Sequence, residues 1–288
     1  MKKPLDTTRS DADLHLHTIF SDGTYTPAAL VKAAKLLSLR AIAVTDHDTL
    51  DGVDPVKAAA GGSLEVVAGV EFSIECGGSE IHLLGLFVDP SNEEIQAQLS
   101  IYRRKRVERI AEILDKLAAM KVNISAEDVF RYAGRGTPGR LHVAMAMIER
   151  GHARDIGTAF GRYLGAGRPA YVRKGCLTAR RTMEIVRAAG GVSVLAHPGI
   201  TRRDDLLPEL VAAGLQGIEV FTGSHTRQQE RAYMKVARER GLLVSGGSDC
   251  HGLHKDKPLI GSVRLPDDRL EALRAASHAG RAPHRSRQ

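Results

Sequence analysis

Apolar and polar residues follow strand and helix periodicities in turn along most of the chain. Polar and apolar residues alternate from Ala12 to His17, which predicts a short strand. Continuous apolar runs, typical of strands buried on both faces, occur at 41–45, 65–70, 191–196, 217–222 and 242–245. Helical patterns lie at 27–39, 54–60, 178–189 and 269–278. This order favours an α/β fold.

Two stretches depart from the alternation of strands and helices. Residues 71–89 predict a β-hairpin around Gly77 and Gly78, in which Ser73 lies opposite His82. In that register His82 lies diagonally from Glu71 on one face of the hairpin. Residues 91–170 instead predict helices only, at 94–120, 125–132, 141–150 and 155–164. We interpret this second stretch as a helical insertion.

The positive charge of the chain is concentrated in this insertion. The formal net charge is +7, and residues 91–175 contain sixteen Lys and Arg against nine Asp and Glu. An anionic partner is therefore expected to bind there, although a solvated basic helix face would give the same pattern.

The remaining bulk features bear on location. No apolar run reaches the length of a membrane span, and no signal-peptide pattern follows Met1. The three cysteines lie far apart, which indicates a reducing compartment. We expect a cytoplasmic protein with no membrane association and no obligate protein partner. The basic tail, 279–288, is expected to be mobile.

Polar side chains recur where the expected strands end. His15 and His17 project from one face of the first strand, together with Asp13. His47, Glu71, His197, Asp249 and His251 follow other strands. In a parallel α/β barrel these ends converge on one mouth. Imidazole and carboxylate ligands there suit zinc, manganese or iron, so we expect metal binding rather than a set of structural core histidines.

The acidic ligands are less clearly defined by the pattern. Asp22 lies in a Ser-Asp-Gly turn that could bring it back over the end of the first strand. Asp13, Asp46 and Asp48 compete with it as ligands, and Asp13 could instead orient a histidine. Cys250 alternates with two ligands and is expected to face away from the metals.

Five motifs in this order resemble the PHP family, named for polymerase and histidinol phosphatase. They are Asp13-Leu-His-Leu-His17, Thr45-Asp-His-Asp48, Gly69-Val-Glu71, Ala196-His-Pro198 and Ser248-Asp-Cys-His251. The resemblance covers roughly residues 12–90 and 171–265. It implies a distorted seven-stranded (β/α) barrel in two parts, 1–90 and 171–288, with the helical basic insertion domain at 91–170 between them.

The resemblance also implies a centre of three divalent metal ions, either manganese, zinc or iron. Carried over by position, the ligands would be His15, His17, Glu71 and Asp249 for the first ion, Glu71, His82 and His197 for the second, and Asp22, His47 and His251 for the third. Clustered divalent metals lower the pKa of a bridging water and act as Lewis acids on a phosphoryl group. We expect attack by a bridging hydroxide held by the Glu71 metals, without a covalent intermediate.

The turn at Asp22 and the basic insertion are similar to one branch of that family. Many histidinol phosphatases of the family have a histidine in the Asp22 region, whereas the branch that cleaves nucleotide and RNA phosphoesters resembles the sequence found here. Members of that branch bind a substrate phosphate with arginines of the insertion. Arg103, Arg106, Arg140 and His142 resemble those positions, and a spacing of three places the first two on one helix face.

His225 follows a strand end outside these motifs. It could hold the scissile phosphate or protonate the leaving oxygen, and a structural role fits equally well.

We therefore expect a metal-dependent phosphoesterase, a phosphatase or exonuclease whose substrate is a nucleotide or short RNA. It would hydrolyse the 3′-phosphate of nucleoside 3′,5′-bisphosphates, short 5′-phosphorylated oligonucleotides, or both. Two alternatives remain. One is a histidinol-phosphate phosphatase. The other is a metal-stabilised nucleic-acid binding module without catalysis, which would bind in a salt-dependent way and form no product.

Overall fold

The computed structural model describes residues 11–134, 136–175, 177–252 and 259–280. Within them, strands form a nine-stranded sheet in the order β8-β7-β6-β4-β3-β2-β1-β9, with β5 beside β3. The longer strands are β1 (Asp11–Leu16), β2 (Leu39–Val44), β3 (Glu65–Cys76), β4 (Ser79–Leu86), β6 (Val192–Leu195), β7 (Gly217–Thr222) and β8 (Leu243–Gly247). The other two, β5 (Leu177–Thr178) and β9 (Leu265–Pro266), have two residues each.

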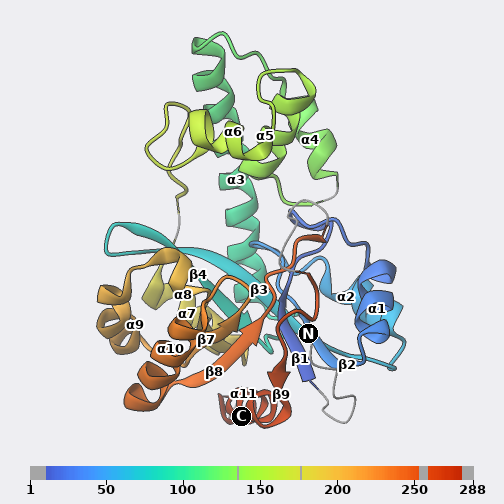
Figure 1. Cartoon of the computed structure of the whole chain (residues 1–288), viewed down its shortest axis with the longest axis vertical. Helices are drawn as coiled ribbons and strands as arrows, with labels where there is room; N and C mark the ends of the chain where they lie inside the picture. Colours follow the sequence, from blue (N-terminus) through green and yellow to red (C-terminus); the bar gives the residue numbers. More distant parts are fainter. Residues whose placement is uncertain (1–10, 135, 176, 253–258, 281–288) are drawn as a thin grey trace, which may run out of the picture.

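The sheet curves until β1, near one end of the strand order, lies beside β8 at the other (Figure 1). His17 N donates to Cys250 O at 3.0 Å and Asp249 N donates to His15 O at 2.9 Å, so the chain beyond β8 pairs with β1. Gly247 permits this approach, because an added Cβ there would lie only 2.4 Å from the Cβ of His15. The expected distorted barrel is confirmed, with seven strands in the ring and the two short strands in addition.

The β3–β4 hairpin has the predicted register. Ser73 pairs with His82, and β4 runs antiparallel to both β3 and β6, whereas the other long strands of the sheet pair in parallel. The expectation that the strand ends at Glu71 was wrong, since β3 continues to Cys76. Its pairing with β2 ends at Ala68, and its pairing with β4 carries it further. Glu71 therefore lies just past the parallel ladder.

Helices pack around the outside of the barrel (Figure 1). They are α1 (Pro27–Leu36), α2 (Val53–Ala60), α7 (Ala179–Ala188), α8 (Pro198–Thr201), α9 (Leu207–Ala213), α10 (Arg227–Arg240) and α11 (Asp267–Gly280). The tail beyond residue 280, expected to be mobile, lies outside the described residues. The sequence pattern did not predict α8, α9 or α10. On α10 only Tyr233 and Ala237 are buried, which leaves too few apolar positions to reveal a helix.

The insertion projects from one end of the barrel and has a hydrophobic cluster of its own (Figure 1). It comprises α3 (Glu93–Ala119), α4 (Ala126–Ala133), α5 (Arg140–Glu149) and α6 (Ile156–Ala159), which continues as a π-helical turn (Phe160–Leu164). The first half of α3 packs into the barrel core through Leu99 and Tyr102, whereas its second half packs within the insertion through Ile113. One long helix thus joins the two parts. No helix in the described residues has the length and apolarity to cross a membrane.

The close contact at Gly247 predicts a stability effect. Gly247→Ala should lower the free energy of unfolding by about 1–3 kcal/mol, because the methyl group would push β8 away from His15 where the barrel closes. Gly161→Ala is the matched control, since an added Cβ there meets nothing within 4 Å and should leave stability unchanged or raise it by up to about 1 kcal/mol. Urea denaturation of the two variants measures the difference, and equal midpoints would contradict this account of closure.

Candidate metal centre and substrate cleft

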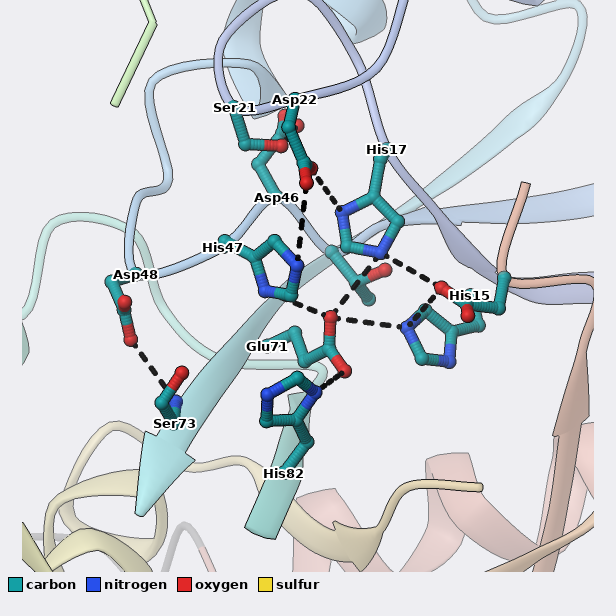
Figure 2. A network of polar contacts seen from close by, with 12 residues as sticks. His15, His17, Ser21, Asp22, Asp46, His47, Asp48, Glu71, Ser73 and His82 are labelled. Atoms are coloured by element: carbon teal, nitrogen blue, oxygen red, sulfur yellow. Dashed lines mark hydrogen bonds and ion pairs between the residues drawn. The ribbon is translucent and has the colours of Figure 1, made fainter. Parts of the chain in front are cut away.

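Histidine and acidic side chains from most strands of the barrel converge at one mouth (Figure 2). His15 lies within β1 and His82 within β4, whereas His17, His47, His197 and His251 lie in the segments that follow strands. Glu71 of β3 lies in the middle of this set, and its side chain is 1% exposed. The nine residues predicted as ligands all contribute to this region.

The carboxylate of Glu71 has imidazoles on both of its oxygens. Five ring nitrogens lie 2.8–3.4 Å from these oxygens, those of His15, His17, His47, His82 and His197. Burial by itself would raise the pKa of Glu71, but the neighbouring His47 and His82 imidazoles hold that pKa well below its usual range. The group is therefore an anion at neutral pH.

The ligand atoms form three overlapping groups, each with all atoms within 4.8 Å of one another. These groups are His15, His17, Glu71 and Asp249; His17, Asp22, His47 and His251; and His47, Glu71 and His82. The first group has the same members as the first implied ligand set. The second group contains the implied third set and adds His17. The remaining group has His47 instead of His197, although His197 Nε2 lies 2.9 Å from Glu71 Oε1.

The donor atoms fit divalent metal ions. Several buried atoms form no hydrogen bond in the described part of the molecule: His15 Nε2, both ring nitrogens of His17, His47 Nδ1, Glu71 Oε2 and His197 Nδ1. Burying a polar atom without a hydrogen-bond partner costs free energy. Several of these atoms lie close enough to one another to bind the same metal ion. Mixed imidazole nitrogen and carboxylate oxygen donors suit zinc, manganese and iron.

Asp46 stabilises the turn that contains Asp22. Its carboxylate accepts hydrogen bonds from Thr18 N (2.7 Å), Thr18 Oγ1 (2.6 Å) and Ser21 Oγ (2.6 Å). These contacts fold the turn back over the end of β1, as Figure 2 shows, so that Asp22 reaches His17 and His47. Of the competing carboxylates, Asp46 thus supports the turn and Asp22 faces the centre.

Asp13 and Glu219 hold the backbone and rings around the centre. Asp13 accepts from Ser248 N (2.8 Å) and Gly261 N (2.9 Å), so it braces the segment after β8 rather than orienting a histidine ring. The ring of His15 instead contacts Glu219, with Nδ1 3.1 Å from Oε1. Sequence reasoning did not single out Glu219, although a carboxylate within the apolar strand at 217–222 was a usable signal.

Three residues at the centre have a left-handed backbone. They are Asp48, His197 and Asp249, with φ of 53°, 28° and 54°. Their N–H groups donate to Glu71 O, Glu219 Oε2 and His15 O, respectively. Non-glycine residues adopt this region at a cost, and here hydrogen bonds within the site maintain it.

A cleft of about 300 Å³ leads from the metal centre toward the insertion. Its walls carry four cationic side chains, those of Arg106, Arg109, Arg140 and Lys174, beside the predicted ligands Asp22, His47, His82 and His251. Two of these cations share one carboxylate. Asp48 accepts from Arg106 Nε at 2.7 Å and from Lys174 Nζ, and Lys174 also donates to Ser73 Oγ at 2.7 Å.

The other two cations lack an equivalent counter-charge. Arg140 has no ion pair among the described residues, and its guanidinium stacks against the rings of Tyr171 and Phe160. Arg109 is 8% exposed, its Nη2 makes no hydrogen bond, and Glu80 lies 3.9 Å away. Burial and the nearby Arg140 lower the pKa of Arg109. A bound anion would relieve this repulsion, so the pair is suited to a phosphate.

Sequence comparisons match this arrangement to known proteins. The PHP domain profile matches residues 13–126. A 3′,5′-nucleoside bisphosphate phosphatase from Chromobacterium violaceum is 32% identical over 249 residues, which span 84% of this chain and 87% of that protein. This chain belongs to the PHP family. A 5′-3′ exoribonuclease from Haemophilus influenzae is 33% identical over 87% of this chain and 96% of that protein.

Solved structures of PHP-like proteins share the whole fold. A Bifidobacterium adolescentis protein described as a metal-dependent phosphoesterase superposes with a TM-score of 0.85 at 32% identity, covering 92% of this chain and 96% of that one. An amidohydrolase from Chromobacterium violaceum gives a TM-score of 0.83 at 31% identity, with the same coverage. The match includes both barrel parts and the insertion.

Within this PHP chain, two of the predicted phosphate-binding residues lie apart from the cleft. Arg103 is exposed on α3 and pairs with Asp51, and it does not line the cleft. The Nδ1 atom of His142 accepts from Gly139 N at 3.1 Å, which caps α5. Arg109 on the same helix as Arg103 was missed, although it stands three residues after Arg106 and shows the same spacing signal.

His225 also has a structural contact at each ring nitrogen. Its Nδ1 donates to Val220 O at 2.9 Å and its Nε2 accepts from Gly199 N at 3.0 Å. The ring thereby supports the segment immediately after His197, and it does not line the cleft. A direct catalytic role for His225 stays a prediction that this geometry does not favour.

Charge balance around Asp48 yields a stability prediction. Asp48→Asn should lower the free energy of unfolding by about 3–5 kcal/mol, because it leaves the buried Arg106 and Lys174 without their counter-ion. The control is Asp51→Asn, which removes the exposed pair with Arg103 and should cost at most about 1 kcal/mol. Chemical denaturation compares the two, and similar losses would refute the assigned charge balance.

Proposed function

We propose that this protein hydrolyses the phosphoester at the 3′-oxygen of nucleoside 3′,5′-bisphosphates and of short 5′-phosphorylated RNA. Its PHP family membership makes it a metal-dependent phosphoesterase, and the names of two relatives supply the substrate classes. The observation that carries the proposal is a second, separate anion site. Arg109 and Arg140 face a cleft that opens from the metal centre, so a substrate with two phosphates can bind at both ends.

The nine residues that line the centre are our proposed metal ligands. They are His15, His17, Asp22, His47, Glu71, His82, His197, Asp249 and His251. The three overlapping groups support three ions, and the nitrogen and oxygen donors leave manganese, zinc and iron as candidates. Such ions supply a water of lowered pKa and Lewis acidity toward the phosphoryl oxygens.

Side chains of the insertion position the substrate relative to the metal centre. We assign the 5′-phosphate to Arg109 and Arg140, which offer charge-assisted hydrogen bonds. The 3′-phosphate then lies at the mouth of the barrel. A water oxygen bonds to phosphorus, the bond between phosphorus and O3′ breaks, and O3′ leaves with a proton as a hydroxyl group. On RNA the same step releases a 5′-nucleotide and leaves a shorter strand that again begins with a 5′-phosphate.

The alternatives fit the cleft less well. Histidinol phosphate has one phosphate and an amino group, so Arg109 and Arg140 would gain no second anion and would repel the ammonium form. A binding module without catalysis does not agree with relatives that are named as enzymes across most of their length. A cytoplasmic location stays our prediction.

The clamp is tested by phosphate release from adenosine 3′,5′-bisphosphate with added manganese. Arg109→Ala and Arg140→Ala should each lower kcat/KM roughly 10- to 100-fold, the loss expected for one charge-assisted hydrogen bond. Arg103→Ala is the control on the same helix and should retain activity within about twofold. A loss with Arg103→Ala equal to that with Arg109→Ala would overturn the clamp. No release by the wild type, with turnover of histidinol phosphate instead, would overturn the proposed function.

Glu219 is tested through metal binding rather than turnover. Glu219→Gln should weaken manganese affinity about 10- to 100-fold, because the amide holds the His15 ring and the His197 backbone less firmly than the carboxylate does. Glu239→Gln, on the surface of α10, should leave affinity unchanged. Metal content after dialysis against graded manganese gives the readout. Equal affinities in the two variants would show that Glu219 does not position ligands.

A further inference from the structure

A second cleft adjoins the first on the far side of His82. It has a volume of about 520 Å³, within the range of small-molecule sites, and shares Glu80, His82 and Arg140 with the first cleft. From there it passes His197 to a wall made by α8 and the residue Arg203. The tip of the β3–β4 hairpin also lines it, through Gly78 and Ser79.

A nucleoside bisphosphate does not need this space. In the binding mode proposed above, its two phosphates lie at Arg109/Arg140 and at the metal centre, and its one nucleoside lies between them in the first cleft, beside Leu141, Ile156 and Phe160. In RNA, by contrast, the scissile phosphate carries a further nucleoside through its O5′ atom. The bound RNA strand must therefore continue away from the metal centre with its second nucleotide. The second cleft begins at the proposed ligands His82 and His197 and offers this path.

The wall of this cleft offers an apolar surface for a base. Ile200 on α8 is 55% exposed, and among the large exposed hydrophobic side chains of the described residues it alone lines either cleft. Bases of single-stranded RNA stack on aromatic side chains, and an exposed aliphatic side chain such as Ile200 can likewise pack against the apolar face of a base of any type. Exposed apolar surface beside a catalytic centre is suited to such a contact.

The contacts of the neighbouring Gly199 with His225 and Gln229 fix the backbone that carries Ile200. The His225 ring accepts from Gly199 N, and Gln229 Nε2 donates to Gly199 O at 3.5 Å. An added Cβ on Gly199 would lie 2.6 Å from each of these side chains, so the turn packs closely against them. Ile200 thus stands on a preorganised turn, and little conformational entropy is lost when a base binds.

Charge in the second cleft argues against a site for many phosphates. Arg203 donates to Asp205 through Nε (2.9 Å) and Nη2 (2.8 Å) and to Ser79 Oγ, so its charge is already compensated. Glu80 adds a carboxylate to the same wall. These features favour one nucleoside held by shape and stacking over a long strand held by its backbone.

We propose that the second cleft is a subsite for the second nucleotide of a 5′-phosphorylated RNA, with its base stacked on Ile200. The inference rests on the proposed function and adds to it the reason why one site processes both substrate classes. It assigns selection for RNA to α8 and binding of the 5′-phosphate to the insertion.

The experiment compares kcat/KM for adenosine 3′,5′-bisphosphate and for 5′-phosphorylated diadenylate in wild type and Ile200→Ala. The variant should lose roughly 5- to 50-fold on the dinucleotide, because alanine removes most of the apolar surface that the base would cover, and stay within twofold on the bisphosphate. Ile200→Phe should restore or raise dinucleotide turnover. Val107→Ala, which removes an exposed apolar side chain of α3 outside both clefts, should change neither substrate.

Each other result has a defined meaning. A wild type that cleaves both substrates, with Ile200→Ala affecting both equally or neither, overturns the subsite and leaves the proposed function intact. A wild type that cleaves only the bisphosphate also overturns the subsite. A wild type inactive on both substrates overturns the proposed function, and the subsite with it.

Discussion

A buried carboxylate surrounded by imidazoles is the constraint on which the rest of this structure depends. Glu71 is 1% exposed and charged, a state that requires compensating groups on every side. Its partners come from β1, from β4 and from the segments after β2 and β6. They meet because the sheet curves strongly, and its closure at Gly247 adds Asp249 and His251 from the segment after β8. Barrel formation and site formation are thus one event.

The barrel and the insertion divide the chemistry between them. The barrel supplies the nitrogen and oxygen donors that fit metal ions. The insertion supplies Arg109 and Arg140, whose charges are only partly balanced, because Asp48 is already paired with Arg106 and Lys174 and Glu80 lies 3.9 Å from Arg109. Charge that the protein leaves unbalanced is available for an anionic substrate. Specificity for an anionic substrate therefore arises from these two arginines, whose positive charges are not fully balanced by carboxylates.

Much of the fold and of the candidate metal centre could be predicted because local pattern indicated the strands and helices, and five short motifs carried the resemblance to the PHP family that implied the barrel and the ligand set. Period-two alternation showed that His15 and His17 share a face, and the Gly77-Gly78 turn set the register that brings His82 to Glu71. The arginine clamp could not be predicted as well. Arg103, Arg106 and Arg109 follow one another at intervals of three residues. Periodicity does not reveal which of them faces the cleft on a 27-residue helix.

What the sequence by itself determined is a set of candidate metal ligands and their place near the strand ends, since strand periodicity places some of them on one face and short motifs of adjacent residues carry the family resemblance that implies the others. Tertiary structure alone decided which charges are balanced. Lys174 neutralises Asp48 across 126 residues, Glu219 contacts His15 across 204, and α8 places Ile200 beside the metal centre. Electrostatic and packing energies depend on distance in space, and no local pattern encodes distances between segments so far apart in the chain.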